Sequence, residues 1–168
     1  MTNPRHPLRL NIGFLINATI GTSRDFNFNY DVMRLGEDLT VCDFIGTARF
    51  SRTPQGFLLQ GEFQAETDLE CVRCLEMNEQ RLKWSVTDLY AFDRRNITES
   101  GLLVPEDGQI DLESLLREYA LLEFPISPVC KPECKGLCPV CGANLNKTAC
   151  GHRLEADSPF AVLKDLLN

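Results

Sequence analysis

The chain has 168 residues, of which 43% are hydrophobic and 24% charged, and this composition excludes a wholly disordered protein. Its net charge of −7 argues against a surface built throughout to grip nucleic-acid phosphates, because such binding depends on clustered lysine and arginine. No apolar run reaches the ~18–20 residues of a membrane span, and Asn11, Gly13 and Asn17 interrupt the apolar stretch near the N-terminus. We therefore read no signal peptide and expect a cytosolic protein of one domain, or of one domain with a small appendage.

The first 95 or so residues have the two-residue hydrophobic period of half-buried strands. Arg24–Tyr30 alternates polar with aromatic side chains, and Thr40–Arg52 and Gly56–Glu70 are also predicted to be extended. The turn residues Thr53–Gly56 join the last two segments, so we expect an antiparallel hairpin there. A further strand is predicted over Gln80–Phe92.

The hydrophobic period changes in the middle of the chain. Residues 93–109 are polar and acidic and are typical of a mobile connector. A helix is predicted near 111–123, with Asp111 as its N-cap and Pro125 beyond its end. Five apolar residues fall on one face of this helix: Leu112, Leu115, Leu116, Tyr119 and Leu122.

These elements predict an α+β fold. We expect an antiparallel β-rich core with one mid-chain amphipathic helix, a Cys-rich zinc-knuckle segment and a short C-terminal helix that begins at Ser158 and Pro159. The expected organisation has two parts. Residues 1–128 form the β-rich core domain with the helix near 111–123, and residues 129–168 form a zinc-binding segment that includes the terminal helix.

Eight cysteines are many for a cytosolic chain of this size. Clustered cysteines favour metal ligation over disulfides in a reducing compartment, with a secreted disulfide protein as the competing interpretation. In the segment from Cys138 to Gly142, two sulfurs can converge on one ion while the glycine permits the tight turn. A tetrahedral Zn²⁺ needs two more ligands, and spacing alone does not decide which four of five cysteines bind it: Cys130, Cys134, Cys138, Cys141 and Cys150.

The pair Cys71 and Cys74 lies between two predicted strands and admits three interpretations. It can complete a zinc site with the C-terminal cysteines, where His152 is a further possible ligand. It can be a redox pair, although the thioredoxin motif opens a helix in a βαβ unit. It can also be a plain reduced pair at a turn. Seven clustered cysteines and His152 would suffice in number for two zinc ions, whereas Cys42, alone in a predicted strand, is expected to be a small core residue.

Four segments carry a recognisable pattern: GFLLQGEFQAETDLECVRCLE at 56–76, IDLESLLREYALLEFPISPVC at 110–130, CKGLCPVCGANLN at 134–146 and DSPFAVLKDLL at 157–167. Together they resemble the YceD (DUF177) family of bacterial and plastid large ribosomal RNA subunit accumulation proteins. The resemblance implies a role in making, processing or stabilising 23S rRNA, and no catalytic reaction. Only the cysteine motifs can be carried over to this chain. Where the family pattern leads us to expect a further cysteine after Cys150, this chain has His152, which can also bind zinc.

We therefore expect a non-enzymatic ribosome-biogenesis factor that acts as a zinc-stabilised docking scaffold, with no catalytic residue, small-molecule substrate or membrane partner. Its expected partner is the precursor of the large ribosomal subunit, in the bacterial cytosol or the plastid stroma. Contact is expected through rRNA, or through a basic ribosomal protein or assembly factor attracted to the acidic residues of 97–123. The alternative is a thiol-redox or zinc-dependent enzyme that uses Cys71 and Cys74 or an open metal position.

Overall fold

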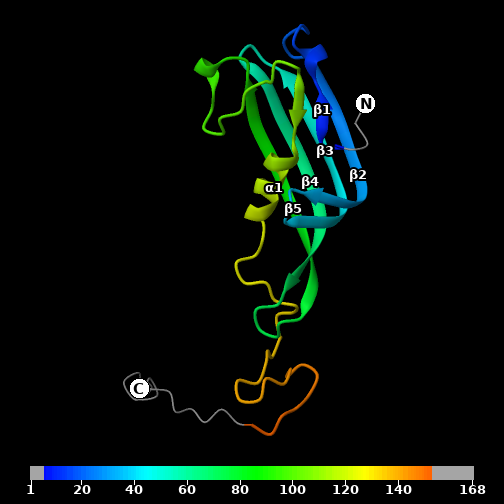
Figure 1. Cartoon of the computed structure of the whole chain (residues 1–168), viewed down its shortest axis with the longest axis vertical. Coiled ribbons are helices and arrows are strands. Elements are labelled where there is room, and N and C mark those ends of the chain that lie inside the picture. Colours follow the sequence, from blue (N-terminus) through cyan, green and yellow to red (C-terminus); the bar gives the residue numbers. More distant parts are fainter. Residues whose placement is uncertain (1–5, 153–168) are drawn as a thin grey trace, which may run out of the picture. The chain divides into compact units, whose positions relative to one another are not determined.

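The computed structural model describes residues 6–152, which divide into two compact units (Figure 1). Of these residues, 6–69 and 78–126 form the first unit, and 70–77 and 127–152 form the second. The segment 70–77 interrupts the first unit in sequence and groups with the Cys-rich part of the chain. The domain boundaries expected from the sequence, 1–128 and 129–168, stay a prediction.

A four-stranded sheet is the main element of the first unit. Its strands neighbour one another in the order β2 (Ser23–Leu35), β3 (Leu39–Arg52), β4 (Gly56–Glu70) and β5 (Met77–Ala91) (Figure 1). Strands β2, β3 and β4 pair antiparallel. All four strands predicted from the alternation of the sequence are present. The expected hairpin joins β3 to β4, where the Thr53 N–H donates a hydrogen bond to the Gly56 carbonyl at 2.9 Å.

Aromatic side chains form the centre of the core on one face of this sheet. The ring of Phe63 stacks against both Phe44 and Trp84 at centroid distances of 5.8 Å, and the Phe44 and Trp84 rings lie 6.1 Å from each other. A Cβ at Gly61 would lie 2.6 Å from the Phe63 ring, and a Cβ at Gly46 would also clash with that ring, so this face has room for Phe63 because both strands carry glycine there. The alternation read from the sequence is therefore the alternation between this core and solvent.

The remaining elements of the first unit cover the core. Strand β1 (Arg9–Asn11) pairs antiparallel with β6 (Gln109–Asp111), and the helix α1 (Glu113–Leu122) follows directly. Short 3-10 turns lie at Gly13–Leu15 (η1) and Arg94–Asn96 (η2). The apolar stripe of α1 is buried at Leu115, Leu116 and Ala120. Among residues 6–152, no helix has both the length and the apolar character needed to cross a membrane.

The expected α+β class is wrong. The described residues form mostly antiparallel β-sheet, and α1 is the one α-helix among them. The helix begins at Glu113 and not near residue 111 as expected, because residues 109–111 form strand β6. Leu112 occupies the N-cap position, while the Asp111 carboxylate accepts a hydrogen bond from the Glu113 N–H at 2.9 Å. The predicted C-terminal helix from Ser158 lies outside the described residues.

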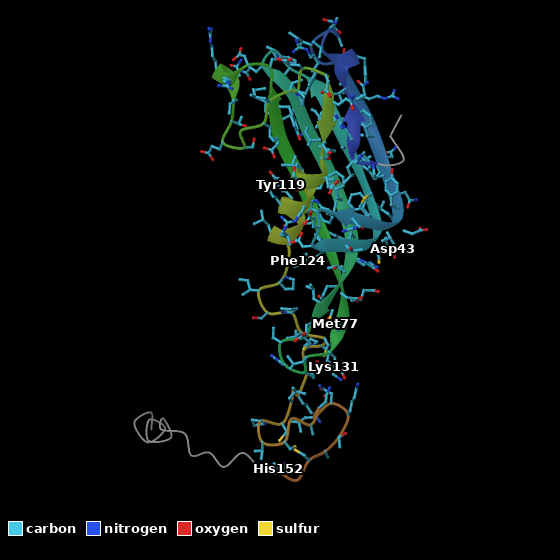
Figure 2. The ribbon with its side chains drawn as sticks, in the orientation of Figure 1. Asp43, Met77, Tyr119, Phe124, Lys131 and His152 are labelled. Carbon is cyan, nitrogen blue, oxygen red and sulfur yellow. The ribbon has the colours of Figure 1, made fainter. Side chains whose placement is uncertain are left out.

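The prediction that Cys42 is a core residue is also wrong, because its side chain is exposed. The register of β3 against β4 shifts between Cys42 and Ile45, and Asp43, which is labelled in Figure 2, has a positive φ of 47°. An extra residue at such a bulge reverses the alternation beyond it. Val41 and Phe44 are therefore both buried, and the two residues between them face solvent.

Candidate metal centres

Four cysteines of the second unit bring their sulfur atoms together, and we call this group site A: Cys71, Cys74, Cys130 and Cys134. All four Sγ atoms lie within 4.8 Å of one another. The Sγ atoms of Cys71 and Cys134 are 3.9 Å apart, and those of Cys74 and Cys130 are 3.7 Å apart. With Zn–S bonds of about 2.3 Å, neighbouring sulfurs of a tetrahedral shell lie roughly 3.8 Å apart. The spacing at site A fits such a shell.

The first half of site A is a tight turn between β4 and β5. The Leu75 N–H donates to the Cys71 carbonyl and the Cys71 N–H donates to the Glu76 carbonyl, both at 2.9 Å. This turn gives Leu75 a positive φ of 58°, in the left-handed region that favours glycine. The Val72 N–H reaches Pro128 with a 2.9 Å hydrogen bond to its carbonyl. That bond ties the turn to the segment that carries the other two cysteines.

Arg73 links the turn at Cys71 to the segment that carries Cys130 and Cys134. Its guanidinium donates to the carbonyls of Pro132 and Cys134 at 3.2 and 3.1 Å. Its own carbonyl accepts a hydrogen bond from the Leu137 N–H at 3.0 Å. A Cβ at Gly136 would lie 3.0 Å from that carbonyl, and Gly136 has a φ of 73°, so glycine suits this position on both counts.

Asn146 is not one of the four cysteines of site A, but its side chain hydrogen-bonds to the sulfur of Cys134. Its Nδ2 donates to Cys134 Sγ at 3.3 Å, and its Oδ1 accepts from the Lys135 N–H at 2.9 Å. Burial alone would raise the pKa of Cys134. The hydrogen bonds from Asn146 and from the Gly136 N–H, together with those of the Cys130 and Cys74 thiols, outweigh burial, so the pKa lies below its usual value. Asn146 therefore favours the thiolate, the form that binds metal.

The pKa values of the thiols at site A are shifted in opposite directions, which is expected of sulfurs that share a site suited to a cation. Backbone N–H groups, first that of Cys130 and then those of Cys74 and Arg73, lower the pKa of Cys71 to about 6. In contrast, burial and the neighbouring sulfurs of Cys134 and Cys74 raise the pKa of Cys130 to about 12. Four adjacent thiols cannot all ionise against one another's charge. A divalent ion at their centre removes that obstacle, and the donor set is the soft thiolate set that zinc accepts.

A second group of four ligands, site B, lies further along the chain and consists of Cys138, Cys141, Cys150 and His152. Their ligand atoms also lie within 4.8 Å of one another, and Cys138 Sγ is 3.9 Å from His152 Nδ1. Figure 2 shows His152 beside sulfur atoms of this loop. Backbone N–H groups of Cys141 and Val140 lower the pKa of Cys138 to about 6.

The expected glycine turn is present at site B. Gly142 has a φ of 71°, and its N–H donates to the Cys138 carbonyl at 2.8 Å. The Cys138 N–H in turn donates to the Ala143 carbonyl at 2.8 Å. Asn144 then reverses the chain, because its carbonyl accepts from the N–H groups of both Lys147 and Thr148. This second turn leads the chain back to Cys150.

The structure divides the five cysteines from which we expected a single site. Cys130 and Cys134 join site A, and the other three join site B. Cys71 and Cys74 join site A, as the first of the three interpretations of that pair requires, and His152 joins site B. Ligation of a metal by either group stays a prediction. Sequence reasoning missed Arg73, Leu75 and Asn146, because no metal-ligand spacing marks them.

Several carboxylates of the acidic stretch 97–123 have partners within the first unit. Asp107 pairs with Arg9 at 3.4 Å, and Glu113 accepts from the Gly36 N–H at 3.0 Å. Asp111 accepts the hydrogen bond from the Glu113 N–H described above, although Leu112 and not Asp111 is the N-cap of α1. Four other carboxylates of this stretch are exposed: Glu99, Glu106, Glu118 and Glu123. These four are the ones available to an external partner.

The family model described as Large ribosomal RNA subunit accumulation protein YceD matches residues 59–167 of the chain. In Arabidopsis thaliana, a protein described as Large ribosomal RNA subunit accumulation protein YCED homolog 1, chloroplastic, is 41% identical over 63 residues. That match covers 37% of this chain and 20% of the plant protein. No solved structure matches the chain.

Bacterial relatives match over longer stretches. An uncharacterized protein of Mycobacterium tuberculosis is 37% identical over 126 residues, which cover 71% of this chain and 59% of that protein. An uncharacterized protein of Mycobacterium leprae is 29% identical over 143 residues, covering 80% of this chain and 65% of that protein. The chain thus spans less than two thirds of the length of these mycobacterial relatives.

Proposed function

The chain belongs to the YceD family, and from this membership we propose that it is a non-enzymatic factor supporting the synthesis, processing or stability of 23S rRNA. The family match over residues 59–167 is the observation that carries the proposal. The name of the Arabidopsis relative, which refers to accumulation of large ribosomal subunit RNA, supports the same assignment. The proposed setting is the compartment in which bacterial-type ribosomes assemble, the bacterial cytosol or the plastid stroma.

The proposed physical role is that of a docking scaffold whose Cys-rich unit is stabilised by Zn²⁺ at site A. Four protein ligands close a tetrahedral shell and leave no position for water, which is the arrangement of structural zinc sites. Sulfur spacings of 3.7 and 3.9 Å support this assignment. An ion there would connect the turn at 70–77 to the segment that begins at residue 127.

The burial of Cys71 and its place in the fold argue against the enzymatic alternative. The low pKa of Cys71 is what a reactive cysteine needs, but its side chain has no exposed surface. The pair Cys71 and Cys74 lies between two strands, whereas the redox motif requires the start of a helix. A thiolate that is buried among three further sulfurs suits a metal ligand better than a nucleophile.

Charge favours a basic protein over RNA as the direct partner. Residues 6–69 and 78–126 contain 18 acidic and 10 basic residues. Residues 70–77 and 127–152 contain 3 acidic and 4 basic residues. Four thiolates around Zn²⁺ would add a net −2 to the second group, which removes its small positive excess. Phosphate binding depends on clustered positive charge, so we propose a basic ribosomal protein or assembly factor as the contact.

Depletion of the protein from its own cells tests the proposed function. We expect the ratio of 23S to 16S rRNA in total RNA to fall, and an unchanged ratio would overturn the assignment. The partner is tested separately by affinity capture of the wild-type chain and of a variant with Glu106→Gln, Glu118→Gln and Glu123→Gln. We expect the variant to recover less of a basic protein at moderate salt. A control with Asp31→Asn and Glu37→Gln neutralises exposed acids elsewhere and should capture normally.

A further inference from the structure

We propose that Cys138, Cys141, Cys150 and His152 bind a second Zn²⁺ of their own, through three sulfurs and one imidazole nitrogen. This site shares no ligand with site A, and the inference stands on the geometry of site B alone. It does not depend on the proposed role in rRNA accumulation, because its tests read metal content in the purified chain.

The ligand atoms are already gathered. All four lie within 4.8 Å of one another, and the 3.9 Å from Cys138 Sγ to His152 Nδ1 is close to the separation that a tetrahedral shell imposes. The four residues supply a complete shell of soft sulfur and borderline nitrogen donors, which is one of the common sets for structural zinc. No fifth group from elsewhere in the chain is needed.

The backbone of site B is shaped by two consecutive turns. The first turn uses the positive φ of Gly142 to present Cys138 and Cys141 from one knuckle. The second, around Asn144, returns the chain so that Cys150 and His152 meet that knuckle. Residues 138–152 bury little besides Cys138, which is 4% exposed. Their folding energy must therefore come from something other than an apolar core, and ligation supplies it.

The two sites should differ in how readily they release their ions. At site A, three of the four cysteines are buried, whereas at site B Cys141 and His152 are exposed. At site B an imidazole also takes the place of one thiolate, so the ligands around its ion carry one negative charge fewer than those of site A. We expect a chelator to remove the site B ion first and the site A ion more slowly.

Elemental analysis of the full-length chain, purified under reducing conditions, tests the proposal. We expect two Zn²⁺ per wild-type chain and one in the Cys150→Ser and His152→Ala variants. His152→Cys restores a fourth ligand and should keep two. Cys74→Ser, which disrupts site A, should keep one ion, and Cys42→Ser should keep two. One ion in the wild type that survives both site B substitutions would overturn the second site.

Cadmium NMR of the chain with Cd²⁺ in place of Zn²⁺ identifies the ligand set of each site. It does not rely on variants that lose metal. We expect two signals from the wild type, one for four sulfurs and one for three sulfurs and a nitrogen. In His152→Cys, only the second signal should move, toward the position of a four-sulfur site. A single signal, or a second signal unmoved by His152→Cys, would contradict the assignment of His152 as a ligand.

Discussion

The Sγ atoms of Cys74 and Cys130 lie 3.7 Å apart although 56 positions separate the two residues in the chain. The intervening residues include β5, β6 and α1. A metal ion that joins the two cysteines would therefore close a long loop of folded structure. Cross-links that close long loops remove the most freedom from the unfolded chain, so site A is where ligation is expected to stabilise this protein most.

Removing one of these ligands should lower stability and metal content together. By analogy with a covalent cross-link that closes a loop of this length, we expect Cys74→Ser to lower the Tm of the metal-bound chain by about 10 °C. Thermal unfolding with parallel zinc analysis measures both effects. Cys42→Ser is the matched control, because Cys42 is exposed and belongs to neither site. An unchanged Tm in Cys74→Ser would show that site A does not hold the structure together.

Leu75 occupies a backbone conformation that favours glycine, so its replacement should be favourable. The left-handed conformation costs a non-glycine residue about 1–2 kcal/mol, and Leu75 is 57% exposed, so little packing is lost with its side chain. Leu75→Gly is expected to raise the free energy of unfolding by about 0.5–1 kcal/mol, after the entropic cost of glycine. Denaturant unfolding of the metal-saturated chain measures the change.

Gly142 provides the reverse experiment. It has a φ of 71° and open space around its Cα, so Gly142→Ala introduces backbone strain and no clash. We expect the free energy of unfolding to fall by about 1 kcal/mol. Gly151 also has open space but no positive φ, and Gly151→Ala should leave stability unchanged. Equal changes in the free energy of unfolding for Gly142→Ala and Gly151→Ala would show that the positive φ at 142 has no cost for alanine. That result would also contradict the prediction for Leu75→Gly.

Asn146 is expected to tune the affinity of site A without touching the ion. Its amide donates to Cys134 Sγ, and the loss of such outer hydrogen bonds typically weakens metal binding by about 10–100-fold. Asn146→Ala should therefore bind zinc more weakly in competition with a chelator. Thr148→Ala alters an exposed residue of the same loop and serves as the control. Equal affinities for the two variants would remove Asn146 from the site.

Thiol alkylation should distinguish metal ligands from free cysteines. In the zinc-bound chain at neutral pH, we expect iodoacetamide to modify Cys42 and to leave the seven cysteines of sites A and B protected. After chelation, all eight should react. Mass spectrometry of the digested chain reads each site separately. Rapid modification of Cys71 in the untreated protein would instead support the thiol-redox alternative.

Much of the first unit could be predicted from the sequence, because each strand of a sheet with one buried face alternates apolar and polar residues. Cys42 shows the limit of that rule. A bulge at Asp43 shifts the register, and a strict two-residue period does not include such a shift. The predicted fold class was wrong because local spacing does not show how large a share of the fold each element takes. The apolar spacing of 112–122 predicts a helix but does not show how small a part of the fold that helix is.

The cysteine motifs could be recognised from the sequence, but their partition could not. Spacing along the chain favours local groups, and Cys138 with Cys141 is such a pair. Site A instead depends on the return of the chain after α1, which places Cys130 and Cys134 against the turn at Cys71. That return is a property of the fold. Only the structure shows that the five C-terminal cysteines serve two groups.

Complementation of depleted cells tests most directly whether the metal-stabilised scaffold supports 23S rRNA. The ratio of 23S to 16S rRNA is measured in cells that express, as their only copy, the wild-type chain, Cys42→Ser or Cys74→Ser at matched protein levels. We predict that wild type and Cys42→Ser restore the ratio and that Cys74→Ser does not. Full restoration by a Cys74→Ser protein that lacks the site A ion would contradict the account.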